Sequence, residues 1–290
     1  MSAGSEPTVT VVIGSNAPPE SLAACLEALE PQRDGVEVLV QEGRPSPADL
    51  RDRFPWADFA LAPDQLVPEH WRDGIDRASG EIVALTIAPM IPARDWIATI
   101  RRLHADHQVV GGAIEPGPRL RLVDWGEYFC RYSRDMPPFE ATGNVELAGD
   151  NAAYERSLLE GIAETYRDGF WEPVSHRRLA ADGVTLWHDP SLVVRQGRSA
   201  GFGAFARQRL AHGRRYGHQR GVHYSRSRNL VGVIAAPLVP VLMTFRVLRQ
   251  VFGKGRYRGR ALLALPVIVA FNVVWAYAEA LGHADMFRGQ

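Results

Sequence analysis

Apolar runs alternate with amphipathic segments over the first 115 residues of the chain. The run TVTVVIG, residues 8–14, is apolar and β-branched, which is typical of a buried strand. In the following PPESLAACLEALE, apolar residues recur at helical spacing after a proline start. The later segments predict strands at GVEVLVQEG, WADFALA, EIVALTI and QVVGGAIEPG, and helices at PEHWRDGIDRASG and PARDWIATIRRLHADH, the last beginning at Pro92. This alternation predicts an α/β fold with a mostly parallel sheet covered on both faces.

Residues 116–194 have a less regular pattern. The segment GDNAAYERSLLEG predicts a strand or loop that runs into a helix, and GFWEPVSHRRLAADG predicts a short helix. The segment VTLWHDPSLVVRQ predicts a pair of strands with a turn at Asp189-Pro190. No GxGxxG motif follows the first strand, so the sequence disfavours a dinucleotide-binding fold.

Two long apolar runs lie near the C-terminus. Residues 261–282 contain one charged residue, Glu279, and form a run long enough to span a bilayer, whereas residues 230–245 form a shorter run interrupted by two prolines. Arginines flank the shorter run on both sides, so a crossing would place one basic flank outside. We therefore expect that run to lie in, or dip into, the cytoplasmic interface. The alternative is a pair of buried helices in a soluble domain.

Composition and charge divide the chain further. Its 290 residues, 46% hydrophobic, suffice for one large domain at 1–221 and a C-terminal membrane-associated helical segment at 222–290. Two cysteines form no disulfide framework, and no signal peptide is indicated, which favours a cytoplasmic location. The net charge is zero, yet residues 195–260 contain fifteen Lys or Arg and no acid. Such a stretch suits anionic lipid or phosphorylated substrate, and no nucleic-acid recognition module is visible.

Five segments, in this order, resemble the family 2 glycosyltransferases, inverting enzymes with one nucleotide-binding α/β domain, the GT-A fold. They are VTVVIGSNAPPESLAACLEAL, VEVLVQEGR, WRDGIDRASGEIVALTIAPMIPARDWI, AGDNAAYERSLLEG and GFWEPVSHRRLAADGVTLWHDPSLVVRQ. The resemblance covers about residues 8–221, and the hydrophobic end resembles the membrane tails of bacterial members that assemble lipids and polysaccharides. It implies a GT-A-like mostly parallel sheet with C-terminal hydrophobic helices, at the cytoplasmic face of the bacterial inner membrane.

The resemblance also implies a nucleotide-sugar site with unusual residues. The family's paired acids after the second strand correspond to Gln41 and Glu42, and its metal-binding Asp-x-Asp corresponds to Ile87, Ala88 and Pro89. These three offer no side-chain oxygen, which hard cations require, so a Mn²⁺ or Mg²⁺ cofactor lacks support in the sequence. Transfer is therefore expected to show little or no metal dependence. The nucleotide-sugar-binding residues implied are Gly14, Ser15, Glu42, Arg72, Thr86 and Ala88.

Glu172 stands where the family has its catalytic base. A carboxylate there can deprotonate an acceptor hydroxyl that attacks the anomeric carbon of the sugar. Asp150 is a second candidate acid, and a solvated surface glutamate is the alternative interpretation of Glu172. The residues implied for the acceptor or its phosphate are Asp150, Asn151, Trp171, His176, Arg178, Arg209 and Arg214. The arginines of residues 207–215 suit phosphate oxygens, or alternatively anionic lipid headgroups.

Two functions follow as hypotheses. The first is an inverting glycosyltransferase that moves a sugar from a nucleotide-sugar donor to a lipid-linked or cell-envelope glycan acceptor. The second is a catalytically inactive protein of the same fold that binds membrane lipids or a partner enzyme as a scaffold. The missing acids in the turn at residues 87–89 favour the second, and Glu172 favours the first.

Overall fold

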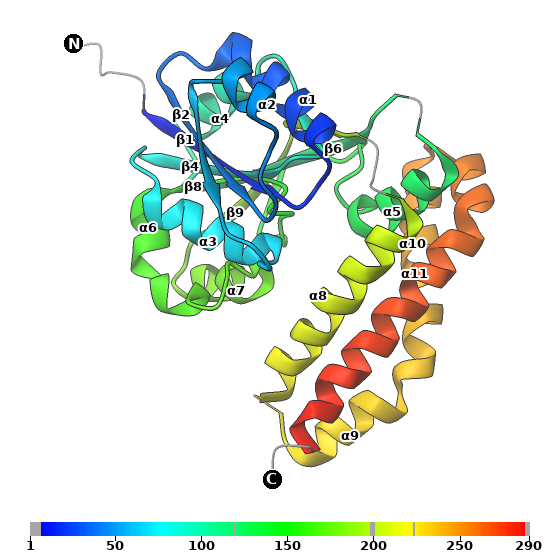
Figure 1. The fold of residues 1–290 in the computed structure, drawn as a ribbon. Helices are drawn as coiled ribbons and strands as arrows, with labels where there is room; N and C mark the ends of the chain where they lie inside the picture. Colours follow the sequence, from blue (N-terminus) through cyan, green and yellow to red (C-terminus); the bar gives the residue numbers. More distant parts are fainter. Residues whose placement is uncertain (1–6, 119, 198–200, 223, 288–290) are drawn as a thin grey trace. The chain divides into compact units, whose positions relative to one another are not determined.

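A computed structural model describes residues 7–118, 120–197, 201–222 and 224–287 of the chain (Figure 1). The contacts divide the chain into two compact units. The α/β unit comprises Met1–Gly117 and Asp135–Gly197, and the helical unit comprises Pro118–Arg134 and Arg198–Gln290. This division differs from the predicted boundary after residue 221, because the helices Leu122–Tyr132 and Phe202–Val222 pack against the helix Arg258–Ala284.

The α/β unit is built on one mixed sheet in the order β3-β2-β1-β4-β8-β6-β9-β5, with β7 paired to β9. Pairing is parallel from β3 through β4 and between β6 and β9, while β8 runs antiparallel to both its neighbours. The predicted α/β fold class is thereby confirmed. The strands are β1 (Val9–Ser15), β2 (Val36–Glu42), β3 (Ala57–Leu61), β4 (Ile82–Ile87), β5 (Met90–Pro92), β6 (Val109–Pro116), β7 (Thr142–Gly143), β8 (Asn151–Glu155) and β9 (Leu186–Gln196).

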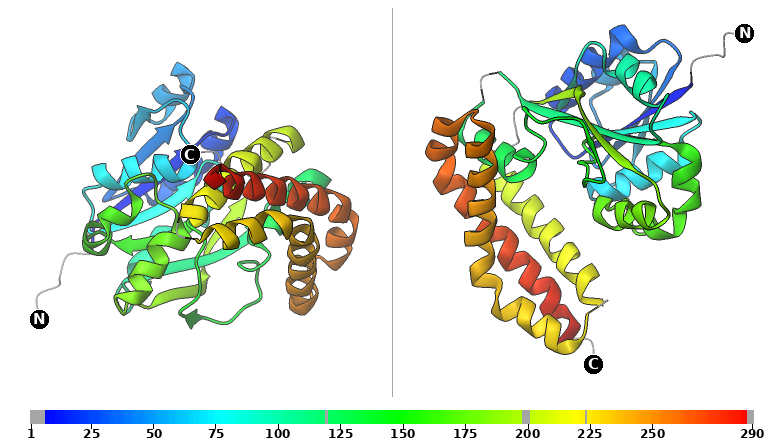
Figure 2. Two further views of the ribbon diagram at one scale, coloured as in Figure 1. Left: turned by 90° about the horizontal axis from the view of Figure 1, so that it is seen from below. Right: turned by 180° about the vertical axis from the view of Figure 1, so that it is seen from behind.

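Helices cover both faces of this sheet (Figures 1 and 2). One face carries α1 (Pro19–Leu29), α2 (Ala48–Arg53) and α4 (Trp96–Leu103), and the other carries α3 (Val67–Arg77), α6 (Arg156–Gly161) and α7 (Glu172–Ala181). Two short 3-10 turns, Glu30–Gln32 and Ala163–Tyr166, complete the unit. The predicted apolar face of α1 is confirmed: its buried residues are Leu22, Cys25, Leu26 and Leu29. The central strand β1 is buried along its whole length, as its apolar run predicted.

Two predicted boundaries in this unit are wrong. The helix expected from Pro92 begins at Trp96, because Met90–Pro92 pair with β9 as strand β5. The strand pair expected around Asp189-Pro190 is one continuous strand, β9, with an irregularity opposite Gly112 and Ala113 of β6. The Asp189 carboxylate accepts hydrogen bonds from the Ser191 backbone N–H and hydroxyl, at 2.9 and 2.6 Å. These local hydrogen bonds stabilise the irregular part of β9, and the chain continues in the same direction.

The helical unit consists of α5 (Leu122–Tyr132), α8 (Phe202–Val222), α9 (Arg226–Ile234), α10 (Val239–Lys254) and α11 (Arg258–Ala284), with 3-10 turns at Ala236–Leu238 (η3) and Asp285–Phe287 (η4). Glycines let α8 and α11 approach closely. A Cβ atom at Gly217 would lie 2.2 Å from the Glu279 carbonyl oxygen, and one at Gly282 would lie 2.2 Å from the Arg214 carbonyl oxygen. Small residues at a helix interface permit such a close approach of two backbones.

Among the described residues, one helix is long and apolar enough to cross a membrane. It is the continuous helix Arg258–Phe287, formed by α11 and η4. The segments Arg226–Ile234 and Ala236–Lys254 meet the same test as one span bent by 46°. By length and composition, the described residues therefore allow up to two membrane spans. The core helices of a soluble protein can meet the same criteria.

Candidate functional site

Five of the six predicted nucleotide-sugar-binding residues, all except Arg72, lie at the carboxyl edge of the parallel strands. Ser15 and Glu42 end the neighbouring strands β1 and β2 in register. The Ala88 backbone N–H donates to the Gly14 carbonyl at 3.2 Å, which joins the end of β4 to the same edge. Ligands of open α/β sheets bind beyond this edge of the strands. Gly14, Ser15, Glu42, Thr86 and Ala88 therefore lie together where a nucleotide would be expected.

Glu42 is held by its own chain. Its buried carboxylate accepts hydrogen bonds from the Ser46 backbone N–H at 3.1 Å and the Ser46 hydroxyl at 2.6 Å, and it forms an ion pair with Arg51. These contacts fix the loop after β2. Both carboxylate oxygens of Glu42 thus have partners within the protein. The predicted role of Glu42 in binding a base or ribose stays a prediction.

The turn after β4 does not fit a divalent cation. The side chains of Ile87, Ala88 and Pro89 carry no oxygen, and the first two are buried. The Pro89 carbonyl accepts the Gly197 backbone N–H at 2.7 Å, so it is engaged as well. Within the described residues, no group of three or more His, Cys, Asp or Glu is arranged to hold a metal ion. The turn after β4 therefore supplies no side-chain ligand to a divalent cation.

The carboxylate of Glu172 points at the start of β8. Glu172 opens α7, and its Oε1 accepts a hydrogen bond from the Gly149 backbone N–H at 3.2 Å. A Cβ atom at Gly149 would lie 2.9 Å from this oxygen and 2.8 Å from the Trp71 ring. Gly149 thus allows the carboxylate and the indole to approach the same loop. Glu172 is half-buried, which leaves part of it accessible.

Trp71 links this carboxylate to the edge of the sheet. Its indole N–H donates to the Thr86 carbonyl at 2.8 Å, and the Thr86 hydroxyl donates to the Asp150 carbonyl at 3.0 Å. Thr86, Asp150 and Glu172 therefore belong to one cluster. Sequence reasoning missed Trp71 and Gly149, because a tryptophan on the apolar face of a helix is indistinguishable from an ordinary core residue.

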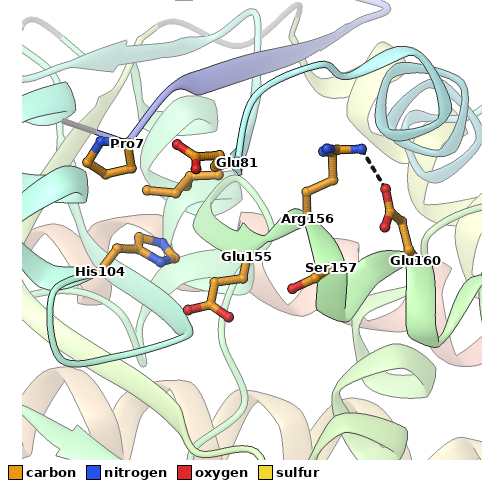
Figure 3. A pocket seen from close by; sticks show the side chains of 8 residues that line it. Pro7, Glu81, His104, Glu155, Arg156, Ser157 and Glu160 are labelled. Atoms are coloured by element: carbon orange, nitrogen blue, oxygen red, sulfur yellow. Dashed lines mark hydrogen bonds and ion pairs between the residues drawn. The ribbon is translucent and has the colours of Figure 1, made fainter. Parts of the chain in front are cut away.

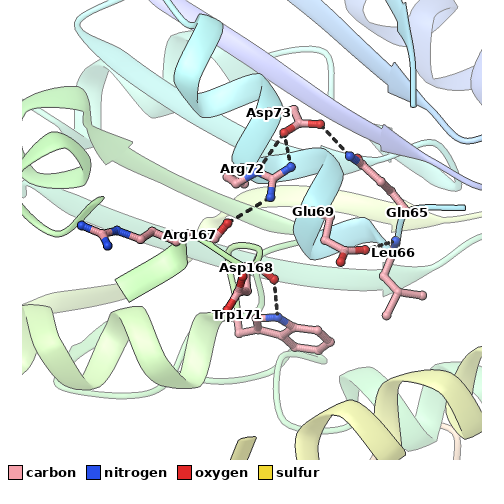
Figure 4. A network of polar contacts seen from close by, with 8 residues as sticks. All are labelled: Gln65, Leu66, Glu69, Arg72, Asp73, Arg167, Asp168 and Trp171. Atoms are coloured by element: carbon pink, nitrogen blue, oxygen red, sulfur yellow. Dashed lines mark hydrogen bonds and ion pairs between the residues drawn. The ribbon is translucent and has the colours of Figure 1, made fainter. Parts of the chain in front are cut away.

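A polar network fixes the start of α7 against α3 (Figure 4). The Arg72 guanidinium binds the Asp73 carboxylate, with Nε at 2.8 Å, and donates to the Arg167 carbonyl at 3.0 Å. The Phe170 backbone N–H donates to the Pro68 carbonyl at 2.7 Å, and the Trp171 indole N–H donates to the Asp168 carbonyl at 3.4 Å. Arg72 and Trp171 thus brace the loop that carries Glu172.

Three other predicted residues make contacts typical of structural roles. The Asn151 amide is fully buried: it accepts the Trp96 indole N–H at 2.8 Å and donates to two backbone carbonyls at 3.0 Å. His176 is buried, with Nε2 at 2.8 Å from the Tyr154 hydroxyl, and burial followed by the charge of Glu172 raises the Tyr154 pKa well above its usual value. Arg178 is exposed and pairs with Glu164 and Asp182.

The two predicted arginines of the later segment belong to the helical unit. Arg209 is buried, and its Nε donates to the Phe271 carbonyl at 2.9 Å. Arg214 forms two hydrogen bonds with the Asp285 carboxylate, at 2.8 and 3.0 Å. Both guanidinium groups are therefore engaged within the helical unit itself.

His70 is a further buried group at the carboxyl edge. Its Nε2 lies 3.2 Å from the Asn16 side-chain oxygen, and burial lowers its pKa, which keeps the ring neutral near pH 7. A Cβ atom at Gly43 would lie 2.1 Å from the same Asn16 oxygen. The loops after β1 and β2 are thereby held together under α3. Sequence periodicity gave no signal for this contact.

A pocket of about 370 Å³ opens at the opposite, amino edge of the sheet (Figure 3). Its lining residues are Pro7, Glu81, Ile82, His104, Glu155, Arg156, Ser157 and Glu160. Burial and the neighbouring His107 lower the pKa of His104 to about 4, so its ring is neutral at pH 7. Arg156 is engaged with the Gly80 carbonyl and with Glu160. This pocket contains none of the predicted site residues.

The fold is similar to that of a solved glycosyltransferase. The solved structure of the mannosyltransferase PcManGT from Pyrobaculum calidifontis, in complex with GDP-Man and Mn²⁺, is similar to this chain with a TM-score of 0.54 and 18% sequence identity. The similarity covers 97% of this chain and 88% of the mannosyltransferase. At this identity it shows the fold alone. No protein-family profile and no curated sequence matches the chain.

Proposed function

We propose that the protein transfers a sugar from a nucleotide-sugar donor to a lipid-linked or cell-envelope glycan acceptor, with inversion and little or no metal dependence. The observation that carries the proposal is the cluster of Glu172, Gly149 and Thr86 at the carboxyl edge of the sheet, within a glycosyltransferase fold. The similar mannosyltransferase was solved with a nucleotide-sugar, which supports a donor of that class.

In the proposed reaction, the acceptor hydroxyl oxygen attacks the anomeric carbon from the face opposite the diphosphate. Glu172 takes the hydroxyl proton as the new bond forms. The bond from the anomeric carbon to the diphosphate oxygen breaks, and the nucleoside diphosphate leaves with the electron pair. The Gly149 N–H orients the carboxylate of Glu172, and the edge formed by Gly14, Ser15 and Ala88 supports the donor.

We further propose that the protein works at the cytoplasmic face of the bacterial inner membrane. Residues 195–260 carry fifteen Lys or Arg and no acid, which suits anionic headgroups. In the helical unit, exposed large apolar side chains follow one another along α9, η3 and α10: Leu230, Val231, Ile234, Leu238, Val241, Leu242 and Phe245. Exposed apolar surface of this extent is typical of a membrane or protein contact.

A second candidate function is that of a catalytically inactive membrane scaffold for a partner enzyme. The turn Ile87-Ala88-Pro89 favours it, because its apolar side chains offer no oxygen to a cation that would neutralise the departing diphosphate. Such a scaffold would arise if a glycosyltransferase lost its catalytic acids by mutation and kept its fold.

The test uses the full-length protein in detergent with a bacterial lipid extract and a panel of nucleotide-sugars. Release of the nucleoside diphosphate and entry of labelled sugar into the lipid or glycan fraction are measured together. The proposal expects both with at least one donor. Donor binding without release across the panel would support the scaffold instead.

A further inference from the structure

Two arginines line one pocket of the helical unit. This pocket, of about 250 Å³, is bounded by α8, α9, η3, α10 and α11. Its polar lining consists of Arg220, Tyr224, Arg228, Glu279 and His283. The remaining wall is formed by small and apolar residues, among them Val231, Ala235, Val239, Ala276 and Ala280.

The pocket carries an excess of positive charge. Glu279 accepts hydrogen bonds from Arg220 at 2.9 Å and from the Trp275 indole at 3.2 Å, so it neutralises one arginine. Among the described residues that line the pocket, Glu279 is the one carboxylate against two arginines. Residues 195–260, which supply α8, α9 and α10, contain no acid, and Asp285 of the adjacent η4 is bound to Arg214.

Tyr224 holds both guanidinium groups at the pocket. The Arg228 guanidinium carbon lies 3.9 Å from the centre of the Tyr224 ring, and that of Arg220 lies 5.5 Å from it. The Arg220 Nε and Nη2 also donate to the Tyr224 hydroxyl, at 3.1 and 3.0 Å. Stacking on an aromatic face leaves the edge of a guanidinium open to a further hydrogen-bond acceptor.

The apolar wall continues onto the surface of the unit. Val231 lines the pocket and is 62% exposed, and its neighbours Leu230, Ile234 and Leu238 are at least half exposed. The volume is slightly below the roughly 300 Å³ at which pockets for drug-sized ligands begin. The pocket therefore has the size for a lipid headgroup, and the acyl chains of that lipid can lie on the neighbouring apolar surface.

We propose that this pocket binds the headgroup of an anionic membrane phospholipid. Arg228 holds the phosphate through charge-assisted hydrogen bonds, beside an Arg220 that is already bound to Glu279 and Tyr224, and the acyl chains lie on the exposed faces of α9 and η3. The inference rests on the membrane association proposed above, and it is independent of sugar transfer.

The test titrates full-length protein in a non-ionic detergent with dihexanoyl phosphatidylglycerol, using isothermal titration calorimetry. Parallel titrations use dihexanoyl phosphatidylcholine and inorganic phosphate. Phosphatidylglycerol should bind saturably and more tightly than either. Arg228→Gln should weaken that binding about tenfold, the scale of a charge-assisted hydrogen bond, and Arg228→Lys should lie between. Arg246→Gln, an exposed arginine of α10 outside the pocket, should leave it unchanged.

Equal affinity of Arg228→Gln and Arg246→Gln for phosphatidylglycerol would overturn the proposal. If phosphatidylcholine bound as tightly as phosphatidylglycerol, the pocket would recognise only the apolar part of the lipid. If inorganic phosphate bound as tightly as phosphatidylglycerol, the pocket would be a simple anion site. Either result also overturns the proposal. Nucleotide-sugar binding by the same samples separates this outcome from failure of the proposed transferase function, because Arg228→Gln should retain donor binding.

Discussion

At the scale of single residues, Glu172 is the group on which turnover should depend. Glu172→Gln preserves size and removes basicity, so donor binding should survive while transfer falls by roughly a hundredfold or more, the usual scale for a positioned base. Steady-state rates and donor titrations of the same samples check this. Glu20→Gln, an exposed change on α1, is the control and should transfer at the wild-type rate. If Glu172→Gln also keeps that rate, the base lies elsewhere and Asp150→Asn becomes the next variant.

His104 should make stability depend on pH. Its pKa is lowered to about 4 in the folded chain, mainly by burial, while an unfolded histidine titrates near 6.5. The unfolded state therefore binds the proton first, and this contribution, present above pH 6.5, is lost as pH falls from 6.5 through 4. The loss should amount to roughly 2–3 kcal/mol after allowance for partial exposure.

Urea unfolding of wild type and His104→Gln at a series of pH values isolates this term. The free energy of unfolding of the wild type should fall more steeply below pH 6.5 than that of the variant. Parallel curves for the two proteins would contradict the assignment.

Individual side chains also show what the sequence could predict. The ends of β1 and β2, and with them Gly14, Ser15 and Glu42, follow from apolar runs that stop at polar residues. The cluster around Glu172 does not, because Trp71 and Gly149 are distant in sequence from Glu172 and meet it through tertiary contacts. The burial of Asn151 does not follow from the sequence either, because a buried amide and an exposed one look alike there.

At the scale of elements, the glycines of α8 set its distance from α11. Gly217→Ala would place a Cβ atom 2.2 Å from the Glu279 carbonyl oxygen, and the two backbones would have to separate. The cost of such overpacking is about 1–3 kcal/mol. The melting temperature of full-length protein in detergent should fall accordingly.

Gly203→Ala is the matched control on the same helix. Its new Cβ atom would have the Arg207 side-chain terminus at 3.6 Å as its nearest neighbour, so it should be neutral or stabilise by up to about 1 kcal/mol through helix propensity. Equal melting temperatures for the two variants would show that α8 and α11 do not depend on close contact at Gly217.

The elements also differ in how far sequence determines them. The strand–helix alternation of the first 115 residues was predictable because period and length agree there. Helix α8 was not predicted, because its arginines and glycines hide an apolar period and its stability comes from packing on α11. The sequence predicts a turn at Asp189-Pro190 in place of the continuous strand β9. A bulge stabilised by hydrogen bonds from Ser191 to Asp189 has the same local sequence as a turn.

At the scale of the whole molecule, the helical unit should hold the protein on membranes through apolar contact as well as charge. Salt at about 1 M reduces the screening length to about 3 Å and releases proteins bound by charge alone. The full-length protein should therefore stay in the membrane pellet after such a wash and enter solution with detergent. Recovery in the soluble fraction at low salt without detergent would contradict membrane association.

The central claim is a donor site that functions without a metal, and its most direct test is a nucleotide-sugar titration of full-length protein with manganese and with a chelator. The turn Ile87-Ala88-Pro89 offers a cation no side-chain oxygen, so the two titrations should give saturable binding with the same affinity. A large gain in affinity with manganese would contradict metal independence, and the absence of binding in both titrations would contradict the donor site itself.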